Sequence, residues 1–402
     1  MPLFLFYSLS PLQLLCSIMN IGFEAKRAFT NGTGLGHYSR TLIRSLATYF
    51  PEHDYTLFTP KITDRFPVAG FNNIKIVTPQ SFPSTMFTGA WRSSWVKSDL
   101  KKLGIDVYHG LSHEIPLGIK KTKIPTTVTI HDLIFERYPE QFNAIDVRIY
   151  RYKFRYACRN ADKIIAISQQ TKEDIINFYK IPKEKITICY QSCNPAFAEI
   201  IADDEKRRIK KLYNLPDQFL LYVGSIIERK NLLNICKALQ HLKDKLNIPL
   251  IVIGDGGAYK QQVQQFVSDN GLQNQVRFLS DDPIIKALPT YQSAADFPAI
   301  YQQALCMIYP SIFEGFGIPV LEALWSRIPV ITSNISCLPE TGGDAAFYVD
   351  PFSITEMADA ILKVSQDHAL QQTMINKGWL HAQNFTQQRC AGSVMEVYKR
   401  LR

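Results

Sequence analysis

The fold is decided by a stretch that reads P-S-I-F-E-G-F-G-I-P-V-L-E-A from Pro310 to Ala323. The apolar run before it ends at Tyr309, and Pro319 suits the first turn of a helix, where its missing N–H is no loss. A strand, a glycine-containing loop and a helix are therefore predicted in that order. Such units build parallel sheets, whose ligands bind beyond the carboxyl ends of the strands.

Short apolar runs alternate with longer amphipathic ones on both sides of this stretch, which is typical of parallel strands joined by helices. A helix is expected from near Leu35, and another over 231–242. Strands are predicted at 20–25, 55–59, 74–77, 107–109, 126–130, 163–167 and 186–189, and in a second series at 219–223, 250–253, 276–279, 305–309 and 329–332. The pattern predicts an α/β protein with two doubly wound, Rossmann-like domains.

The chain has 402 residues, too many for one ordinary core. We expect domains at 19–200 and 201–386, with a polar linker at 202–211 and a last helix over 387–402. Residues 1–18 are apolar and uncharged, but they lack the basic region and cleavage site of a signal peptide and are short for a membrane span. We interpret them as a misassigned or unstructured extension before a start at Met19; a short membrane-associating segment is the alternative.

Composition indicates a globular protein, with 46% hydrophobic and 20% charged residues. The eight cysteines contain no C-x-x-C, so they are predicted to be reduced residues of a cytoplasmic protein and not a disulfide framework or a zinc site. The formal charge is +9, yet no motif that reads DNA or RNA accompanies it. A nucleic-acid partner is therefore not expected.

Part of the positive charge gathers in one stretch, 148–163, where basic residues alternate with aromatic ones. Such a stretch suits anionic lipid headgroups or phosphorylated substrates. The alternative is a solvated helix whose aromatic side is buried. The residues concerned are Arg148, Tyr150, Arg151, Tyr152, Lys153, Phe154, Arg155, Tyr156, Arg159 and Lys163.

Two features of the first half are candidates for ligand contact. The loop G-T-G-L-G from Gly32 to Gly36 lets backbone N–H groups approach a phosphate or sugar, although a tight turn explains it equally well. A dinucleotide fingerprint fails on spacing, because position 37 is His and position 39 is Ser. His131, followed by Asp132, ends an apolar strand, where a side chain can reach a ligand in the cleft.

In the second half, Arg229 and Lys230 lie at the predicted start of a helix. Cations there oppose the helix dipole, which makes sense if an anion is bound, although two solvated basic residues are the alternative. Glu314 is predicted in the loop after the strand and Glu322 on the following helix, where they can accept hydrogen bonds from hydroxyl groups. A glycosidase acid/base pair would leave the glycines and the Arg-Lys pair without a purpose.

Taken together, these residues closely resemble the family-4 retaining glycosyltransferases (glycosyl transferases group 1), with two Rossmann-like domains facing across a cleft in the GT-B architecture. The E-x7-E spacing of Glu314 and Glu322 matches that family's signature, and the resemblance runs from Met19 to the C-terminus. It includes the G-x-G loop, His131-Asp132, I-A-I-S at 165–168, R-K-N at 229–231 and the segment from Leu338 to Ala346.

The resemblance implies roles for single positions. Glu314 would contact the transferred sugar, Glu322 the ribose, and His131 the sugar near the reacting carbon. Arg229 and Lys230 would neutralise the leaving diphosphate, together with backbone amides near Phe316, Gly317 and Val320, and with Gly34 and Gly36 from the first domain. Some members carry arginine where this chain has Ser225, which puts the individual role of Arg229 in doubt. The terminal helix would cross back to the first domain.

The resemblance also implies retention of the anomeric configuration, no metal, and no protein base beside the acceptor. The sequence contains no D-x-D. We expect a mannosyl-type transferase that uses a GDP- or UDP-sugar and a glycan or lipid-linked acceptor, in bacterial surface polysaccharide synthesis such as that of lipopolysaccharide. It would work in the cytoplasm, with peripheral contact to the inner face of an anionic membrane. A sugar-nucleotide epimerase and a non-catalytic sugar-nucleotide-binding scaffold are the alternatives.

Overall fold

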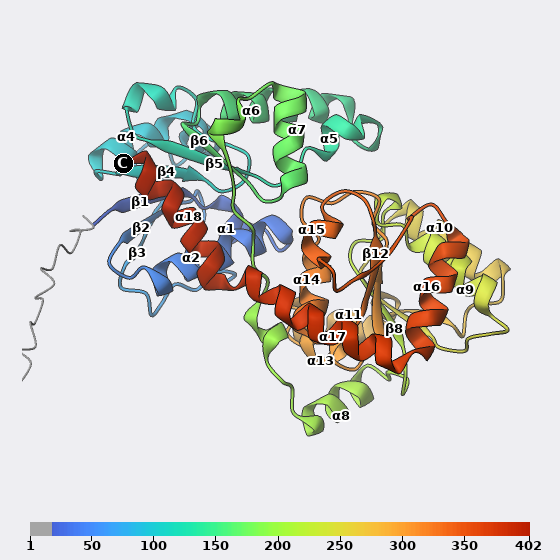
Figure 1. Ribbon diagram of the computed structural model, residues 1–402. Helices are drawn as coiled ribbons and strands as arrows, with labels where there is room; N and C mark the ends of the chain where they lie inside the picture. Colours follow the sequence, from blue (N-terminus) through green and yellow to red (C-terminus); the bar gives the residue numbers. More distant parts are fainter. Residues whose placement is uncertain (1–17) are drawn as a thin grey trace, which may run out of the picture.

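The computed structural model describes residues 18–402, and Figure 1 shows them as two α/β halves joined by a single crossing of the chain and by the C-terminal helices. The interpretation of residues 1–17 lies outside the described residues. The two predicted doubly wound domains are confirmed, because each half is built on a parallel sheet.

The first sheet has seven strands in the order β3-β2-β1-β4-β5-β6-β7, all parallel. They are β1 (Asn20–Glu24), β2 (Asp54–Phe58), β3 (Ile74–Val77), β4 (Val107–Gly110), β5 (Thr126–Ile130), β6 (Lys163–Ala166) and β7 (Ile186–Ile188). Helices cover both faces: α1 (Lys26–Thr30), α2 (Gly34–Tyr49), α3 (Thr88–Ala90), α4 (Val96–Lys102), α5 (Ile134–Arg137), α6 (Ala144–Asn160) and α7 (Gln169–Tyr179).

The second sheet has six parallel strands in the order β10-β9-β8-β11-β12-β13. They are β8 (Leu220–Val223), β9 (Leu250–Ile253), β10 (Val276–Phe278), β11 (Cys306–Tyr309), β12 (Val330–Ser333) and β13 (Phe347–Val349). The α-helices after β7 are α8 (Asp203–Leu212), α9 (Leu232–Leu242), α10 (Ala258–Asp269), α11 (Pro283–Ala287), α12 (Pro289–Gln292), α13 (Phe297–Tyr301), α14 (Ile318–Trp325), α15 (Leu338–Gly342), α16 (Ile354–Gln366) and α17 (His368–Ala382), followed by the terminal helix α18 (Gln387–Leu401).

The central strands form because they are apolar on both faces. Every residue of β5, β8, β9 and β11 is buried, which is the pattern expected when helices cover both sides of a parallel sheet. Each fully buried aliphatic or aromatic side chain, such as Ile21 or Phe23, contributes about 1.5–3 kcal/mol relative to exposure. This burial fixes the strand ends, and with them the loops at the carboxyl edges.

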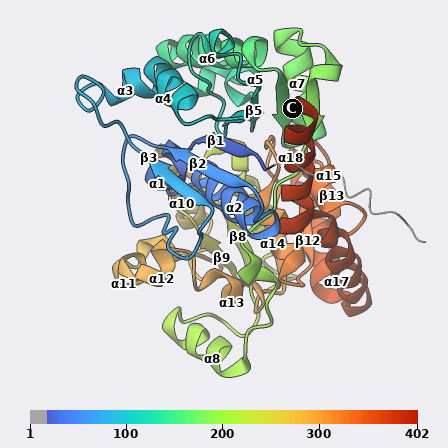
Figure 2. The ribbon, with the colours of Figure 1, turned by 90° about the vertical axis from the view of Figure 1, so that its left-hand side faces the viewer.

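The C-terminal helix α18 leaves the second half and lies on the first, as both views of the ribbon show (Figures 1 and 2). It packs against α2, and the buried Tyr398 hydroxyl lies 2.6 Å from Nδ1 of His109 in β4. On its other side, the His109 ring reaches the Thr129 hydroxyl at 2.8 Å. His109 is therefore a core residue that ties α18 to the first sheet.

Three local features differ from the sequence expectations or complete them. The segment predicted as a polar linker forms helix α8, whose first turn is acidic and whose last turn is basic, as the helix dipole favours. Strand β13 was not predicted. The seven cysteines within 18–402 are free and buried, as expected of core residues. No helix in the described part of the chain is long and apolar enough to span a membrane.

Candidate active site

The loops after β5 and β11 bring the two halves together at the carboxyl edges of their sheets. Gly315 lies so close to the main chain of His131 that a Cβ atom would stand 2.2 Å from the His131 carbonyl oxygen. Next to it, the Phe313 ring packs edge-on against Tyr138 at 5.9 Å and lies under the guanidinium of Arg137 at 5.1 Å. The structure thus places His131 beside the Glu314 loop, as a shared site requires.

Glu314 is held through one oxygen only. Its Oε1 accepts hydrogen bonds from the Tyr309 hydroxyl at 2.9 Å and the Ser311 hydroxyl at 2.8 Å, and it pairs with Arg229 Nη1 at 2.9 Å. No hydrogen bond within residues 18–402 uses Oε2, and that atom is not fully buried. One oxygen fixes the side chain, and the other is free to accept a hydrogen bond from a ligand.

The charges around Glu314 keep it ionised. Burial alone would raise the pKa of Glu314, but Lys230 and Arg229, with the hydrogen bonds from Ser311 and Tyr309, outweigh that effect and hold the pKa below its usual range. The Lys230 Nζ lies 4.0 Å from Oε1 and the Arg229 guanidinium is closer. Glu314 is therefore an anionic acceptor at neutral pH.

Glu322 is similarly anchored, but it is in a different electrostatic state. It lies on α14, where Oε2 accepts a hydrogen bond from the buried Tyr301 hydroxyl at 2.9 Å, and no contact in the described chain uses Oε1. Burial raises the pKa of Glu322 to about 7, because only the Tyr301 hydrogen bond and a more distant Lys230 oppose it. The two signature glutamates thus differ in charge near neutral pH.

Arg229 and Lys230 lie in a short 3-10 helix, Glu228–Lys230, and α9 begins only after Asn231, which adopts a left-handed conformation. The expectation that the two cations open the helix is therefore wrong in detail. The Asn231 side chain explains the arrangement, since its amide donates to the carbonyl oxygens of Pro310 at 3.2 Å and Pro351 at 2.7 Å. These bonds hold the basic pair against the end of β11.

The two cations have different surroundings. Arg229 is occupied, because its guanidinium pairs with Glu314 and donates to the Phe313 carbonyl oxygen. Lys230 donates no hydrogen bond to residues 18–402, and its ammonium lies 5.2 Å from the centre of the Tyr309 ring. Burial lowers the pKa of Lys230, although Glu314 opposes the shift. Lys230 is the cation that is free for an anionic ligand.

The backbone after Glu314 offers a set of unused donors. The N–H groups of Gly315, Phe316 and Gly317 donate no hydrogen bond within the described chain, and Gly317 has φ +92°, a conformation that favours glycine. Successive free N–H groups at the start of a helix form a phosphate-binding nest. Val320, which the resemblance also placed at the phosphates, is different, because its N–H already bonds to the Gly317 carbonyl oxygen at 2.9 Å.

His131 is buried and neutral. Its Nε2 lies 2.9 Å from the Leu111 carbonyl oxygen, and since a carbonyl only accepts, Nε2 carries the hydrogen. Burial lowers the pKa of His131 to about 4. The ring meets Tyr38 edge-on at 4.5 Å and His113 at 5.0 Å. His131 can therefore act on a ligand as a neutral imidazole and not as a cation.

The first-half glycines behave differently from one another. A Cβ atom at Gly36 would stand 2.0 Å from the Asn31 carbonyl oxygen, and the Gly36 N–H already bonds to the Thr33 carbonyl oxygen at 2.9 Å. Close packing at the start of α2 explains that glycine. Gly34 has open space around it. The predicted phosphate contact stays a prediction for both positions.

A cavity that sequence reasoning missed lies at the carboxyl ends of β8 and β9, with a volume of about 400 Å³. Tyr291 and Phe297 line it, with ring centres 5.6 Å apart, together with Gly224, Gly254 and the Asp255–Lys286 ion pair at 2.8 Å. Aromatic rings and polar groups of this kind suit a flat heterocycle. The G-D-G-G run at 254–257 was the signal in the sequence, but Tyr291 is distant from that run along the chain, and only the fold brings the two together.

Glu340 connects the halves near the site. Its carboxylate accepts the Gln169 N–H at 2.8 and 2.9 Å and the Tyr190 hydroxyl at 2.8 Å. Gln169 is the first residue of α7, so an acid of the second half lies against a helix N-terminus of the first, where negative charge is favoured. The residues within 18–402 contain no cluster of three or more His, Cys, Asp or Glu side chains that could hold a metal ion.

Two family models match the chain, one in each half. "Glycosyltransferase Family 4" matches residues 32–197, and "Glycosyl transferases group 1" matches residues 203–380. The chain is 25% identical over 385 residues to O-antigen chain mannosyltransferase B of Escherichia coli, covering 92% of this chain and 96% of the relative. It is 27% identical over 347 residues to O-antigen chain mannosyltransferase RfbU of Salmonella typhimurium, covering 84% and 88%.

A solved structure with the same fold is Anabaena Alr3699/HepE in complex with UDP and glucose. Its TM-score is 0.70 at 16% sequence identity, covering 95% of this chain and 99% of that one.

Proposed function

The chain belongs to the GT-B glycosyltransferases, joining a Glycosyltransferase Family 4 half to a glycosyl transferases group 1 half, and we propose that it transfers mannose or a similar hexose from a GDP- or UDP-sugar with retention of the anomeric configuration. The observation that carries the proposal is the free Oε2 of Glu314, an ionised acceptor directly before three unused backbone N–H groups. Sugar hydroxyls donate to the first, and diphosphate oxygens accept from the second.

We assign the four parts of the donor to four groups of residues in the site. The diphosphate is assigned to the amides of 315–317 and to Lys230, and the sugar to Glu314 and His131. The ribose is assigned to Glu322 and the base to the cavity beside Tyr291. The solved complex of a similar fold with UDP and glucose supports a nucleotide sugar, and the relatives named as mannosyltransferases support mannose.

The reaction we propose needs no protein base at the acceptor. An acceptor hydroxyl bonds to the anomeric carbon on the face from which the diphosphate leaves, while the bond from that carbon to the phosphate oxygen breaks. The hydroxyl proton passes to the departing phosphate oxygen. Lys230 and the backbone amides stabilise the negative charge that develops on the leaving group, without a metal ion or other cofactor.

For the acceptor we propose a glycan or lipid-linked glycan, used in bacterial surface polysaccharide synthesis. The names of the relatives, which are O-antigen chain mannosyltransferases, support this assignment. We further propose a cytoplasmic location with peripheral contact to the inner membrane face. The basic and aromatic side chains of α6, of which Tyr152 is 64% exposed, support that contact.

The test is a panel of nucleotide sugars, followed by ³¹P and ¹H NMR without an acceptor. We expect slow release of a nucleoside diphosphate from one donor, and no release by Glu314→Gln. A changed sugar still attached to its nucleotide would instead establish an epimerase. If a donor is bound but none is turned over, the chain is a non-catalytic sugar-nucleotide-binding scaffold; if no donor is bound, the proposal fails.

A further inference from the structure

Helix α15 lies where the two halves meet, directly beneath α7 in Figure 1. Its Glu340 side chain accepts hydrogen bonds at 2.8 Å from the Gln169 N–H, at the start of α7, and from the Tyr190 hydroxyl. Tyr190 follows β7, where the chain leaves the first half. Glu340 therefore fixes α15 to two elements of the first half.

The segment 336–341, which overlaps α15, also holds the donor loop, residues 314–317. The Ser336 hydroxyl bonds to the Glu314 main chain in both directions, accepting from its N–H at 3.2 Å and donating to its carbonyl oxygen at 3.0 Å. The Cys337 thiol donates to the same carbonyl oxygen at 3.1 Å. Ser336 has φ +61°, which is unfavourable for a residue with a side chain, and these bonds offset that cost.

The other end of the donor loop is held in the same way. The Thr341 hydroxyl donates to the Phe316 carbonyl oxygen. Leu338 lies against Gly317, where a Cβ atom would stand 2.7 Å from the Leu338 Cδ2 atom. The segment 336–341 thus contacts the donor loop at both of its ends.

The two carbonyl groups held by this segment determine where two of the unused N–H groups point. A peptide unit is planar and trans, so its C=O and the N–H of the next residue point in opposite directions. The Glu314 carbonyl belongs to the same unit as the Gly315 N–H, and the Phe316 carbonyl to the same unit as the Gly317 N–H. Fixing the two oxygens from one side therefore aims the two N–H groups to the other.

The first half closes these contacts into a ring through His131. Thr171, in the first turn of α7, donates to the His131 carbonyl oxygen at 3.1 Å. That oxygen is also the atom against which Gly315 packs. The contacts run from His131 through α7 and Glu340 to α15, and through the donor loop back to His131.

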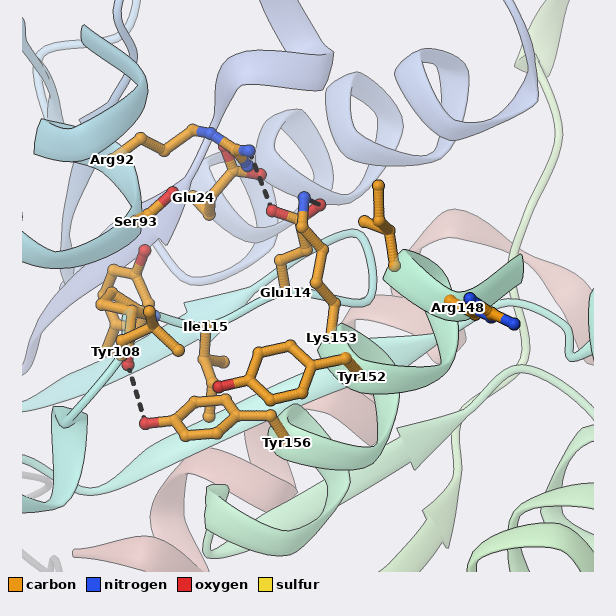
Figure 3. Close-up of a pocket in the computed structure, with 13 residues that line it drawn as sticks. Glu24, Arg92, Ser93, Tyr108, Glu114, Ile115, Arg148, Tyr152, Lys153 and Tyr156 are labelled. Carbon is orange, nitrogen blue, oxygen red and sulfur yellow. Dashed lines mark hydrogen bonds and ion pairs between the residues drawn. The ribbon is translucent and has the colours of Figure 1, made fainter. Parts of the chain in front are cut away.

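The surroundings of His131 are held within the first half. Lys153 of α6 pairs at 3.1 Å with Glu114, in the loop after β4, beside a cavity of this half (Figure 3). His113 of the same loop stacks on Phe154 of α6 with ring centres 4.2 Å apart, and its ring centre is 5.0 Å from that of His131. The loop, α6 and His131 thus form one packed unit, against which Glu340 holds α15.

The Phe316 side chain connects the donor loop to both crossings of the chain between the halves. Its ring centre is 6.0 Å from that of Tyr190, in the first crossing, and 5.5 Å from that of Phe385, in the second. Phe316 and Phe385 are both buried. A change in the relative position of the halves therefore acts directly on the donor loop.

We propose that Glu340, Ser336 and Thr341 are positioning residues for the donor diphosphate. Glu340 sets α15 against the first half, and Ser336 and Thr341 in turn aim the N–H groups of Gly315 and Gly317. This assignment rests on the proposed donor site. The phosphate-binding loop is then complete only while the halves are in contact, so diphosphate binding and that contact strengthen each other to the same extent.

The experiment measures the affinity for the diphosphate and for the nucleoside separately. GDP and UDP are titrated by calorimetry, and guanosine and uridine by NMR. In Thr341→Val, which lacks the hydroxyl, we expect the diphosphate Kd to rise about tenfold, while the nucleoside Kd stays within twofold because a nucleoside does not reach the donor loop. Thr341→Ser keeps the hydroxyl and should restore most of the affinity.

A double-mutant cycle tests whether Glu340 acts through Thr341. Glu340→Ala alone should also raise the diphosphate Kd about tenfold. The double variant Glu340→Ala/Thr341→Val should show about the same tenfold rise and not a hundredfold one, since both substitutions release the same peptide unit. The control is Asp359→Ala, an exposed carboxylate on α16, away from α15 in Figure 1, which should bind both ligands as wild type does.

Three results overturn the assignment: a Thr341→Val protein that binds the diphosphate as wild type does, an equal loss of nucleoside affinity, or a hundredfold effect in the double variant. If Thr341→Val does not fold, Tyr190→Phe takes its place, since it removes one bond to Glu340. It should raise the diphosphate Kd about threefold without changing the nucleoside Kd, and an unchanged diphosphate Kd overturns the assignment.

Failure of the proposed function gives a different pattern. If wild type binds neither GDP nor UDP, the proposed function fails and the positioning assignment fails with it. If wild type binds one of them and the variants bind it equally well, only the positioning assignment fails. If the cycle gives the expected values but no nucleotide sugar is turned over, the proposed transfer fails and the positioning assignment stands.

Discussion

Replacing Lys230 with glutamine separates the effect of this residue on ligand binding from its effect on stability. The Lys230 side chain is only 14% exposed, donates no hydrogen bond to residues 18–402, and has a lowered pKa because burial disfavours its charge. Its one ion pair within residues 18–402 is with Glu314, at 4.0 Å, and Glu322 is more distant. A charged group with so few partners contributes little to folding, so we expect the free energy of unfolding to change by no more than about 1 kcal/mol.

Binding of a nucleoside diphosphate should respond much more strongly. A hydrogen bond to a charged group contributes about 1.5–3 kcal/mol, which corresponds to a loss of about 10- to 150-fold in affinity. The assay is calorimetric titration with GDP and UDP, with thermal melts of the ligand-free protein in parallel. Lys243→Gln, on an exposed position of the same half, is the control and should leave both quantities unchanged.

Two outcomes would refute this reasoning. If Lys230→Gln binds the diphosphate as wild type does, the ammonium is not part of the phosphate site. If the variant melts several degrees lower, Lys230 has a structural role that its missing hydrogen bonds do not show.

The other predictions concern the three glutamates. Glu314→Gln keeps the shape of the side chain but loses the charge, so kcat should fall about 100- to 1000-fold while GDP affinity changes less than threefold; a smaller fall in kcat would remove Glu314 from the sugar site. Burial raises the pKa of Glu322 to about 7 from an ordinary 4.5, so its contribution to stability is fully present below pH 4.5 and is lost as the pH rises through 7. Over that window the free energy of unfolding of wild type should fall by about 2–3 kcal/mol relative to that of Glu322→Gln. Denaturant titrations of both proteins across this pH range measure the difference, and a difference that does not change with pH would contradict the assignment. Glu340→Ala removes the bonds to Gln169 and Tyr190 between the halves, so the radius of gyration in solution should rise and the donor KM increase about tenfold; an unchanged scattering profile would show that Glu340 does not hold the halves together.

The fold was largely predictable because its strands are buried on both faces. A run such as Thr126–Ile130 is read from composition alone, and its predicted bounds agree with β5. Strand β13 was missed because it has three residues and two of them are half-buried. Helix α8 was missed because only Ile209 of its ten residues is buried, so it shows little apolar periodicity.

The site was predictable where its residues are close in sequence, and not where tertiary contacts decide. The spacing of Glu314 and Glu322 predicted a loop position and a helix position, which the structure confirms. That Arg229 pairs with Glu314, leaving Lys230 free, depends on how β8 and β11 pair in the sheet. The raised pKa of Glu322 depends on burial beside Tyr301, which no local pattern reveals.

The most direct test of the central claim is the anomeric configuration of the transferred sugar. With the donor identified by the NMR panel and a glycan acceptor that it glycosylates, the first product formed is followed by ¹H NMR before any further reaction, and the one-bond C–H coupling at the anomeric carbon is measured. Retention in a product whose formation requires Glu314 is the predicted result. Inversion at that carbon, or transfer that proceeds equally well in Glu314→Gln, would contradict the account.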